Sequence, residues 1–148
     1  MISILEMLKP IVFLAYIALL ITAGAIDIQR GVIPDKLVFV ILFLSIPLAL
    51  LIRTGILERL VIFLPIIVLL AFLWLYTGGI GGGDIKLIAA SGIALTAVNF
   101  YSALLISFAG SAIFLNAASI FKIKRIKYTP FAPFWAIVVL VSHFLCKR

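Results

Sequence analysis

Two aspartates, Asp27 and Asp84, are the residues of this chain whose type and position could do chemistry. Each borders a long apolar stretch, where a carboxylate is costly and marks a functional-site hypothesis by default. Asp84 follows a run of glycines, which would allow another backbone to approach closely. Taken alone, this stretch is equally compatible with a glycine-rich turn in which Asp84 caps the next helix.

Two carboxylates that share a partly dry site push their pKa values apart, so that one is protonated while the other is ionised. An aspartic protease needs this pair, because the ionised member activates water and the protonated member polarises the scissile carbonyl. We expect Asp84 at a helix N-terminus and Asp27 at a helix C-terminus. The helix dipoles then favour Asp84 as the resting base and Asp27 as the resting acid.

The composition places these residues in a membrane protein. Of 148 residues, 66% are hydrophobic, whereas a soluble domain averages about half. Apolar runs of about 20 residues recur along the chain and predict transmembrane helices. We therefore expect an all-α, polytopic membrane bundle, with residues 1–148 forming a single integral membrane domain. Cys146 is the only cysteine, which excludes an internal disulfide and a cysteine zinc cluster, and we expect no metal or other cofactor.

The apolar runs predict about six transmembrane helices, and their order places the two aspartates at one membrane face. The expected spans cover about residues 10–26, 37–52, 60–76, 85–98, 100–121 and 130–145. Asp27 ends the first span and Asp84 begins the fourth, so both lie on the same side in either orientation. The fourth span is short, with a tight turn expected at Thr96 and Asn99, and its small residues predict a place at the bundle centre.

The basic residues predict the orientation. The net charge of +7 lies in short loops, which suits orientation and lipid headgroups better than nucleic acid. The side that holds the aspartates carries seven of the 12 basic residues. The positive-inside rule then puts both termini outside and both aspartates at the cytoplasmic face. A basic loop on that side is expected to contact anionic lipid through Lys122, Lys124, Arg125 and Lys127.

Three segments together resemble the prepilin peptidase family, the GxGD aspartic proteases. The segment Gly81-Gly82-Gly83-Asp84-Ile85-Lys86-Leu87 is similar to the family's Gly-x-Gly-Asp-x-Lys-Leu motif. Asp27, followed by Ile33-Pro34-Asp35-Lys36-Leu37, resembles the first catalytic aspartate and the segment after it. Pro130-Phe131-Ala132-Pro133-Phe134 resembles a segment near the family's C-terminus.

The resemblance implies that Asp27 and Asp84 are the catalytic pair of an inner-membrane peptidase. Its substrates would be type IV prepilin-like or preflagellin-like precursors, whose leader is cleaved at the cytoplasmic face. Six further residues of the motifs would bind substrate or shape the site: Gly81, Gly83, Lys86, Pro34, Pro130 and Pro133. Larger relatives also methylate the new N-terminus and carry a cytoplasmic region with paired cysteines. The chain shows no such region, so it resembles the compact, peptidase-only type, such as tight-adherence pilin or preflagellin peptidases, and we expect no methylation.

Other functions remain open at this point. A small proton or cation transporter could use paired acids, but it predicts polar groups at the bilayer midplane rather than at one face. A non-catalytic assembly subunit would use the glycines for packing only and would leave the facing aspartates unexplained. A presenilin-like protease shares the GxGD pattern but has its first aspartate deep within a span. The oligomeric state, the substrate and the cleavage-site residues cannot be read from this sequence.

Overall fold

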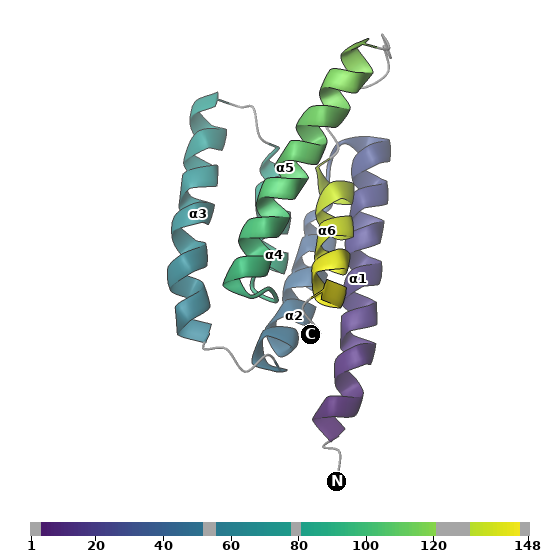
Figure 1. The fold of residues 1–148 in the computed structure, drawn as a ribbon, viewed down its shortest axis with the longest axis vertical. Coiled ribbons are helices and arrows are strands. Elements are labelled where there is room, and N and C mark those ends of the chain that lie inside the picture. The colour runs from purple at the N-terminus through teal and green to yellow at the C-terminus, as the bar shows by residue number, and fades with distance from the viewer. Residues whose placement is uncertain (1–3, 52–55, 78–80, 121–130, 146–148) are drawn as a thin grey trace.

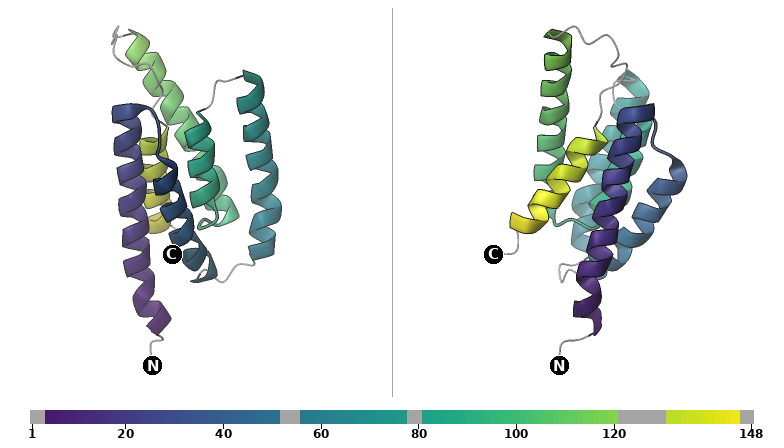
Figure 2. Two further views of the ribbon diagram at one scale, coloured as in Figure 1. Left: turned by 180° about the vertical axis from the view of Figure 1, so that it is seen from behind. Right: turned by 90° about the vertical axis from the view of Figure 1, so that its right-hand side faces the viewer.

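Six α-helices and no strand make up the part of the chain that the computed structural model describes, residues 4–51, 56–77, 81–120 and 131–145 (Figure 1). In chain order they are α1 (Ile4–Arg30), α2 (Asp35–Leu51), α3 (Ile56–Thr77), α4 (Gly82–Gly92), α5 (Ala97–Ile120) and α6 (Ala132–Leu145). The predicted all-α bundle is confirmed, and each expected span corresponds to one helix. Consecutive helices run in opposite directions (Figures 1 and 2).

Helix length separates the six helices into two groups. Three are long and apolar enough to cross a membrane, over Leu8–Arg30, Arg59–Tyr76 and Ala97–Ile120. At 1.5 Å per residue, the 11 residues of α4 extend only about 16 Å, roughly half of a hydrocarbon core of about 30 Å. The short fourth element is therefore confirmed as short.

The turn after α4 lies slightly earlier than the sequence predicts. The chain leaves α4 after Gly92, and Asn99 already lies within α5. Thr96 caps this helix: its carbonyl accepts a hydrogen bond from Phe100 N at 2.8 Å, and its hydroxyl accepts one from Asn99 N at 3.4 Å. A threonine side chain suits this position because it satisfies one of the free N–H groups of the first turn.

The order of the helices around the bundle differs from their order in the chain. The principal contacts run from α1 to α2, then to α4, α3, α5 and α6, and α6 returns to α1. In this arrangement α4 lies between α2 and α3. This position lets α1, α4 and α6 share one interior. Six residues of α4 are buried: Ile85, Leu87, Ile88, Ala90, Ser91 and Gly92. The predicted interior position of this small-residue helix agrees with that burial.

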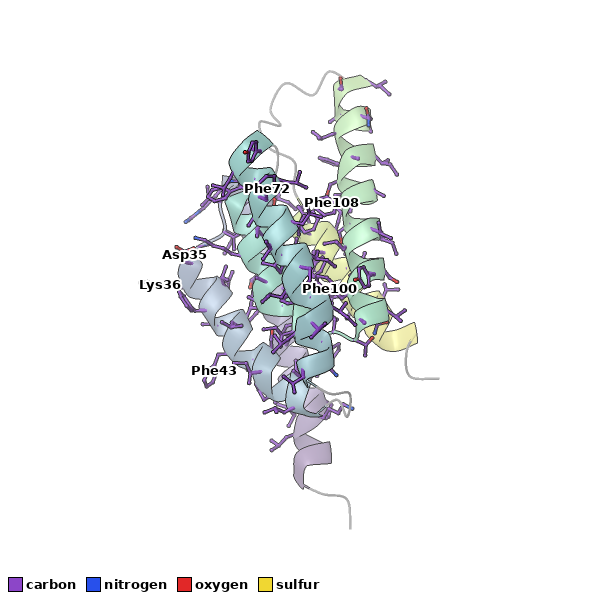
Figure 3. The ribbon with its side chains drawn as sticks, turned by 90° about the vertical axis from the view of Figure 1, so that its left-hand side faces the viewer. Asp35, Lys36, Phe43, Phe72, Phe100 and Phe108 are labelled. Carbon is purple, nitrogen blue, oxygen red and sulfur yellow. The ribbon has the colours of Figure 1, made fainter. Side chains whose placement is uncertain are left out.

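The outer surface of the bundle is apolar over most of its height. Phe43 on α2 is 76% exposed and points away from the bundle, whereas Phe100 on α5 is 2% exposed (Figure 3). Asp35 and Lys36 lie at the end of α2 where that helix begins (Figure 3). An exposed apolar belt on helices of this length is typical of a surface in contact with lipid.

Candidate active site

Asp27 lies in the last turn of α1, and its carboxylate meets the first turn of α6. The side chain is buried, with 9% of its surface exposed. Its Oδ2 atom accepts a hydrogen bond from the backbone N–H of Ala132 at 3.3 Å. The first N–H groups of a helix have no partner within that helix. Asp27 therefore supplies an acceptor to the N-terminus of α6.

Asp84 is the third residue of α4, and Gly81 holds the N-cap position before it. The carbonyl of Gly81 accepts hydrogen bonds from Asp84 N at 3.0 Å and Ile85 N at 3.3 Å. The Asp84 carboxylate folds back over this glycine, because a Cβ atom on Gly81 would lie 2.9 Å from Asp84 Oδ2. The alternative in which Asp84 is itself the N-cap is thus wrong.

The charge of Asp27 acts on Asp84. Burial first, and then the negative charge of Asp27, raise the pKa of Asp84 to about 7. Asp84 lies outside the three helices that are long enough to cross a membrane. The end of α1 and the beginnings of α4 and α6 are at the same end of the bundle (Figure 1). The structure therefore brings Asp27 and Asp84 together, at one end, as the span order predicts.

The surroundings of the two carboxylates favour the opposite division of roles from the one expected. The sequence places Asp27 at the C-terminus of α1 and so predicts it as the protonated member. In the bundle, its carboxylate meets the N-terminus of α6, where backbone donors and the helix dipole favour the ionised form. Asp84 lies at the partially positive N-terminus of α4, which favours its ionised form. It is also buried beside the like charge of Asp27, which favours its protonated form. Asp27 is therefore the member favoured as ionised, and Asp84 the member favoured as protonated.

Three of the other predicted site residues organise the loop between α1 and α2. The carbonyl of Pro34 accepts hydrogen bonds from the backbone N–H groups that open α2, at 3.0 and 3.3 Å. Gly83 faces the same loop, since an added Cβ would lie 3.6 Å from Ile33 Cβ. Lys86 pairs with Asp35, with Nζ 2.7 Å from Oδ1, and both side chains are more than half exposed. Lys86 thus forms an exposed ion pair with the first residue of α2.

Pro133 lies at the interface of α6 with α1. A Cβ added to Gly24 would be 2.9 Å from Pro133 Cα, so the two backbones are nearly in contact. Pro130 and the basic loop of Lys122, Lys124, Arg125 and Lys127 lie outside the described residues. No group of three His, Cys, Asp or Glu residues that could hold a metal ion lies within the described ranges.

A second polar cluster, which the sequence does not predict, lies deeper in the bundle. The hydroxyl of Tyr16 donates to the carbonyl of Ser91 at 3.0 Å, and the indole N–H of Trp135 donates to the Ser91 hydroxyl at 2.8 Å. All three residues are at most 1% exposed. A polar side chain in an apolar span is the signal that could have identified them, but Ser91 also fits the small-residue packing pattern.

Comparison with known proteins identifies the family. Residues 14–116 match the model of the type IV leader peptidase family, and that match contains both aspartates. Comparisons with curated proteins and with solved structures gave no match. The match covers more than half of the chain, so the protein belongs to the type IV leader peptidase family.

Proposed function

We propose that the protein is an aspartic endopeptidase that removes the leader from type IV prepilin-like or preflagellin-like precursors, with Asp27 and Asp84 as its catalytic pair. The observation that supports this most directly is the influence of the Asp27 charge on the pKa of Asp84, at one end of the bundle. Two acids from helices far apart in sequence meet there, each in a setting that favours a different protonation state. That arrangement suits acid–base catalysis near neutral pH.

The reaction assigns one role to each acid. Ionised Asp27 takes a proton from a water molecule, and the resulting hydroxide attacks the carbonyl carbon of the scissile peptide bond. Protonated Asp84 donates a hydrogen bond, and then its proton, to the carbonyl oxygen. When the tetrahedral intermediate collapses, the proton held by Asp27 passes to the leaving amine while Asp84 recovers its own. Water is consumed, the peptide bond breaks, and both carboxyls return to their starting states.

The membrane arrangement suits a precursor that has a single apolar helix. Such a helix can lie in the bilayer beside the apolar belt of the bundle, while the leader crosses the interface to reach the carboxylates. We place this end at the cytoplasmic face of the cell membrane from the distribution of basic residues. The basic loop at that face would contact anionic lipid. We further propose that the protein lacks methyltransferase activity.

Co-expression with a pilin-like precursor tests the proposal. The wild-type protein should shorten the precursor, and Asp27→Asn and Asp84→Asn should each abolish the shortening. Asp35→Asn is the matched control, because it makes the same chemical change at the same end of the bundle on an exposed side chain. Processing that persists in both aspartate variants would rule out the mechanism, and no processing by the wild-type protein would argue against this substrate class.

A further inference from the structure

Gly24 of α1 lies directly against Pro133 of α6. Gly24 is buried and lies one turn before Asp27 on the same face of the helix. A Cβ atom there would be 2.9 Å from Pro133 Cα and 3.1 Å from Pro133 N. These are backbone atoms of a proline in the first turn of α6, so they cannot move aside as the end of a side chain can.

The contact is adjacent to the hydrogen bond that Asp27 accepts. Ala132, which donates that bond, directly precedes Pro133 in the chain. The N···O distance is already 3.3 Å, near the long limit for a hydrogen bond of this kind. If α6 moved away from α1 by about 1 Å, the distance would exceed that limit.

We propose that Gly24 is a positioning residue, whose missing side chain lets the first turn of α6 approach α1 closely enough for Ala132 N–H to bind the Asp27 carboxylate. The consequence for the acid pair rests on the proposed function, but the geometry does not. With the bond intact, a backbone N–H stabilises the ionised carboxylate of Asp27. Without it, Asp27 loses a backbone donor and its ionisation requires a higher pH.

Among the described residues, the groups that stabilise the ionised Asp27 carboxylate are backbone N–H groups rather than charged side chains. From α4 it faces Asp84, whose pKa the charge of Asp27 raises. The described first turn of α6 contains no titratable side chain. At the start of α2, Asp35 is paired with Lys86, and Arg30 at the end of α1 is exposed. The N–H groups of α6 are thus the described donors to the carboxylate.

A second glycine at α6 provides a matched control. Gly110 on α5 also faces α6, and a Cβ there would lie 2.7 Å from the ring of Phe134. The atom it meets belongs to a side chain, which can rotate. Gly110→Ala therefore adds the same methyl group against the same helix from the other side, away from the hydrogen bond.

The test measures the protonation of Asp27 directly in purified, detergent-solubilised protein. Carbodiimide labels protonated carboxyls, and peptide mass spectrometry reports the labelled fraction of Asp27 as a function of pH. We expect the labelling midpoint to rise by about one pH unit in Gly24→Ala, the size expected for one hydrogen bond to a charged group. It should stay unchanged in Gly110→Ala. The acidic limb of the pH–cleavage profile should shift in the same direction.

Ala132→Pro removes the same N–H without adding a methyl group to α1, and proline is tolerated at the first position of a helix. It should raise the Asp27 midpoint as well. An unchanged midpoint in Gly24→Ala, an equal shift in Gly110→Ala, or a Gly24→Ala protein that does not fold would each overturn the proposal. The labelling needs no substrate, so a wild-type protein that fails to cleave precursors would refute the proposed function alone.

Discussion

The same three helices are joined twice, at two depths, by clusters of very different character. At the end of the bundle, Asp27 of α1, Asp84 of α4 and Ala132 N–H of α6 form the acid cluster. Deeper inside, Tyr16, Ser91 and Trp135 of the same helices form a neutral cluster. Ser91 lies seven residues after Asp84 on α4, which is two helical turns or about 10 Å.

The difference lies in how well each cluster satisfies its groups. In the neutral cluster, both donors find acceptors on one serine, whose own hydroxyl donates to Leu87 O at 2.6 Å. A satisfied neutral network in a core fixes one packing arrangement. In the acid cluster, two like charges compete and the pKa of Asp84 rises to about 7. The comparison suggests that one cluster holds the three helices in place so that the other can hold an unfavourable pair of charges.

The largest effect is expected when the unfavourable charge is removed. Asp84 has a folded-state pKa of about 7 against an ordinary value of 3.8, so the folded protein binds a proton more tightly than the unfolded chain. Stability should therefore fall as pH rises from about 4 to 7, by at most about 1.4 kcal/mol per unit. Asp84→Asn should flatten this decline and be more stable than wild type at pH 8, while losing activity. Denaturation in detergent across this pH range measures it, and an unchanged slope would contradict it.

A smaller effect of opposite character is expected in the neutral cluster. Ser91→Ala leaves the buried indole N–H of Trp135 without its acceptor, which should cost about 1–3 kcal/mol of unfolding free energy. The loss should be the same at pH 5 and pH 8, because no group in this cluster titrates in that range. Ser102→Ala is the control, since Ser102 makes the same type of bond to its own helix, to Val98 O at 2.9 Å, at an exposed position. A pH-dependent loss in Ser91→Ala would show that the clusters are not separate.

The smallest effect should distinguish two glycines of one motif. A methyl group on Gly81 would lie 2.9 Å from Asp84 Oδ2, whereas one on Gly83 would lie 3.6 Å from Ile33, an ordinary contact. The backbone of Gly81 has φ −65° and ψ 131°, which alanine adopts readily. Gly81→Ala should therefore displace the carboxylate and slow cleavage about tenfold, an effect of about 1.4 kcal/mol on the barrier. Gly83→Ala should cleave at close to the wild-type rate, and the reverse order would refute this assignment.

The sequence predicts which helix ends share a face, because that depends only on how often the chain crosses. It therefore brings Asp27 and Asp84 to one end of the bundle, and the break at Thr96 predicts the short α4. It does not predict which helices are neighbours, since these spans are apolar on nearly every side. The contact of Asp27 with α6 depends on which helices are neighbours, and so the sequence could not include the backbone donor of α6 when it assigned the acid and base roles.

The side-chain partners show the same limit. Lys86 lies two residues after Asp84 in the glycine-rich motif, which favours a role at the carboxylates, yet its described partner is Asp35 on α2. Ser91 has the size that predicts helix packing and the hydroxyl that predicts a hydrogen bond, and the structure uses both properties. Periodicity cannot separate such roles, because each depends on a residue at least 44 positions away.

The neutral cluster also bears on membrane permeability. Hydrolysis requires water at the carboxylates, and a water-filled path through the bundle would dissipate the ion gradients of the cell. Three apolar residues between the two clusters are fully buried: Leu20, Leu87 and Ile88. The polar groups of the neutral cluster, which lie further inward, are hydrogen-bonded to one another. Water that reaches Asp27 and Asp84 therefore meets these buried apolar side chains, and behind them the neutral cluster, whose donors already have acceptors. The bundle can keep one end wet for chemistry while the membrane stays sealed to protons.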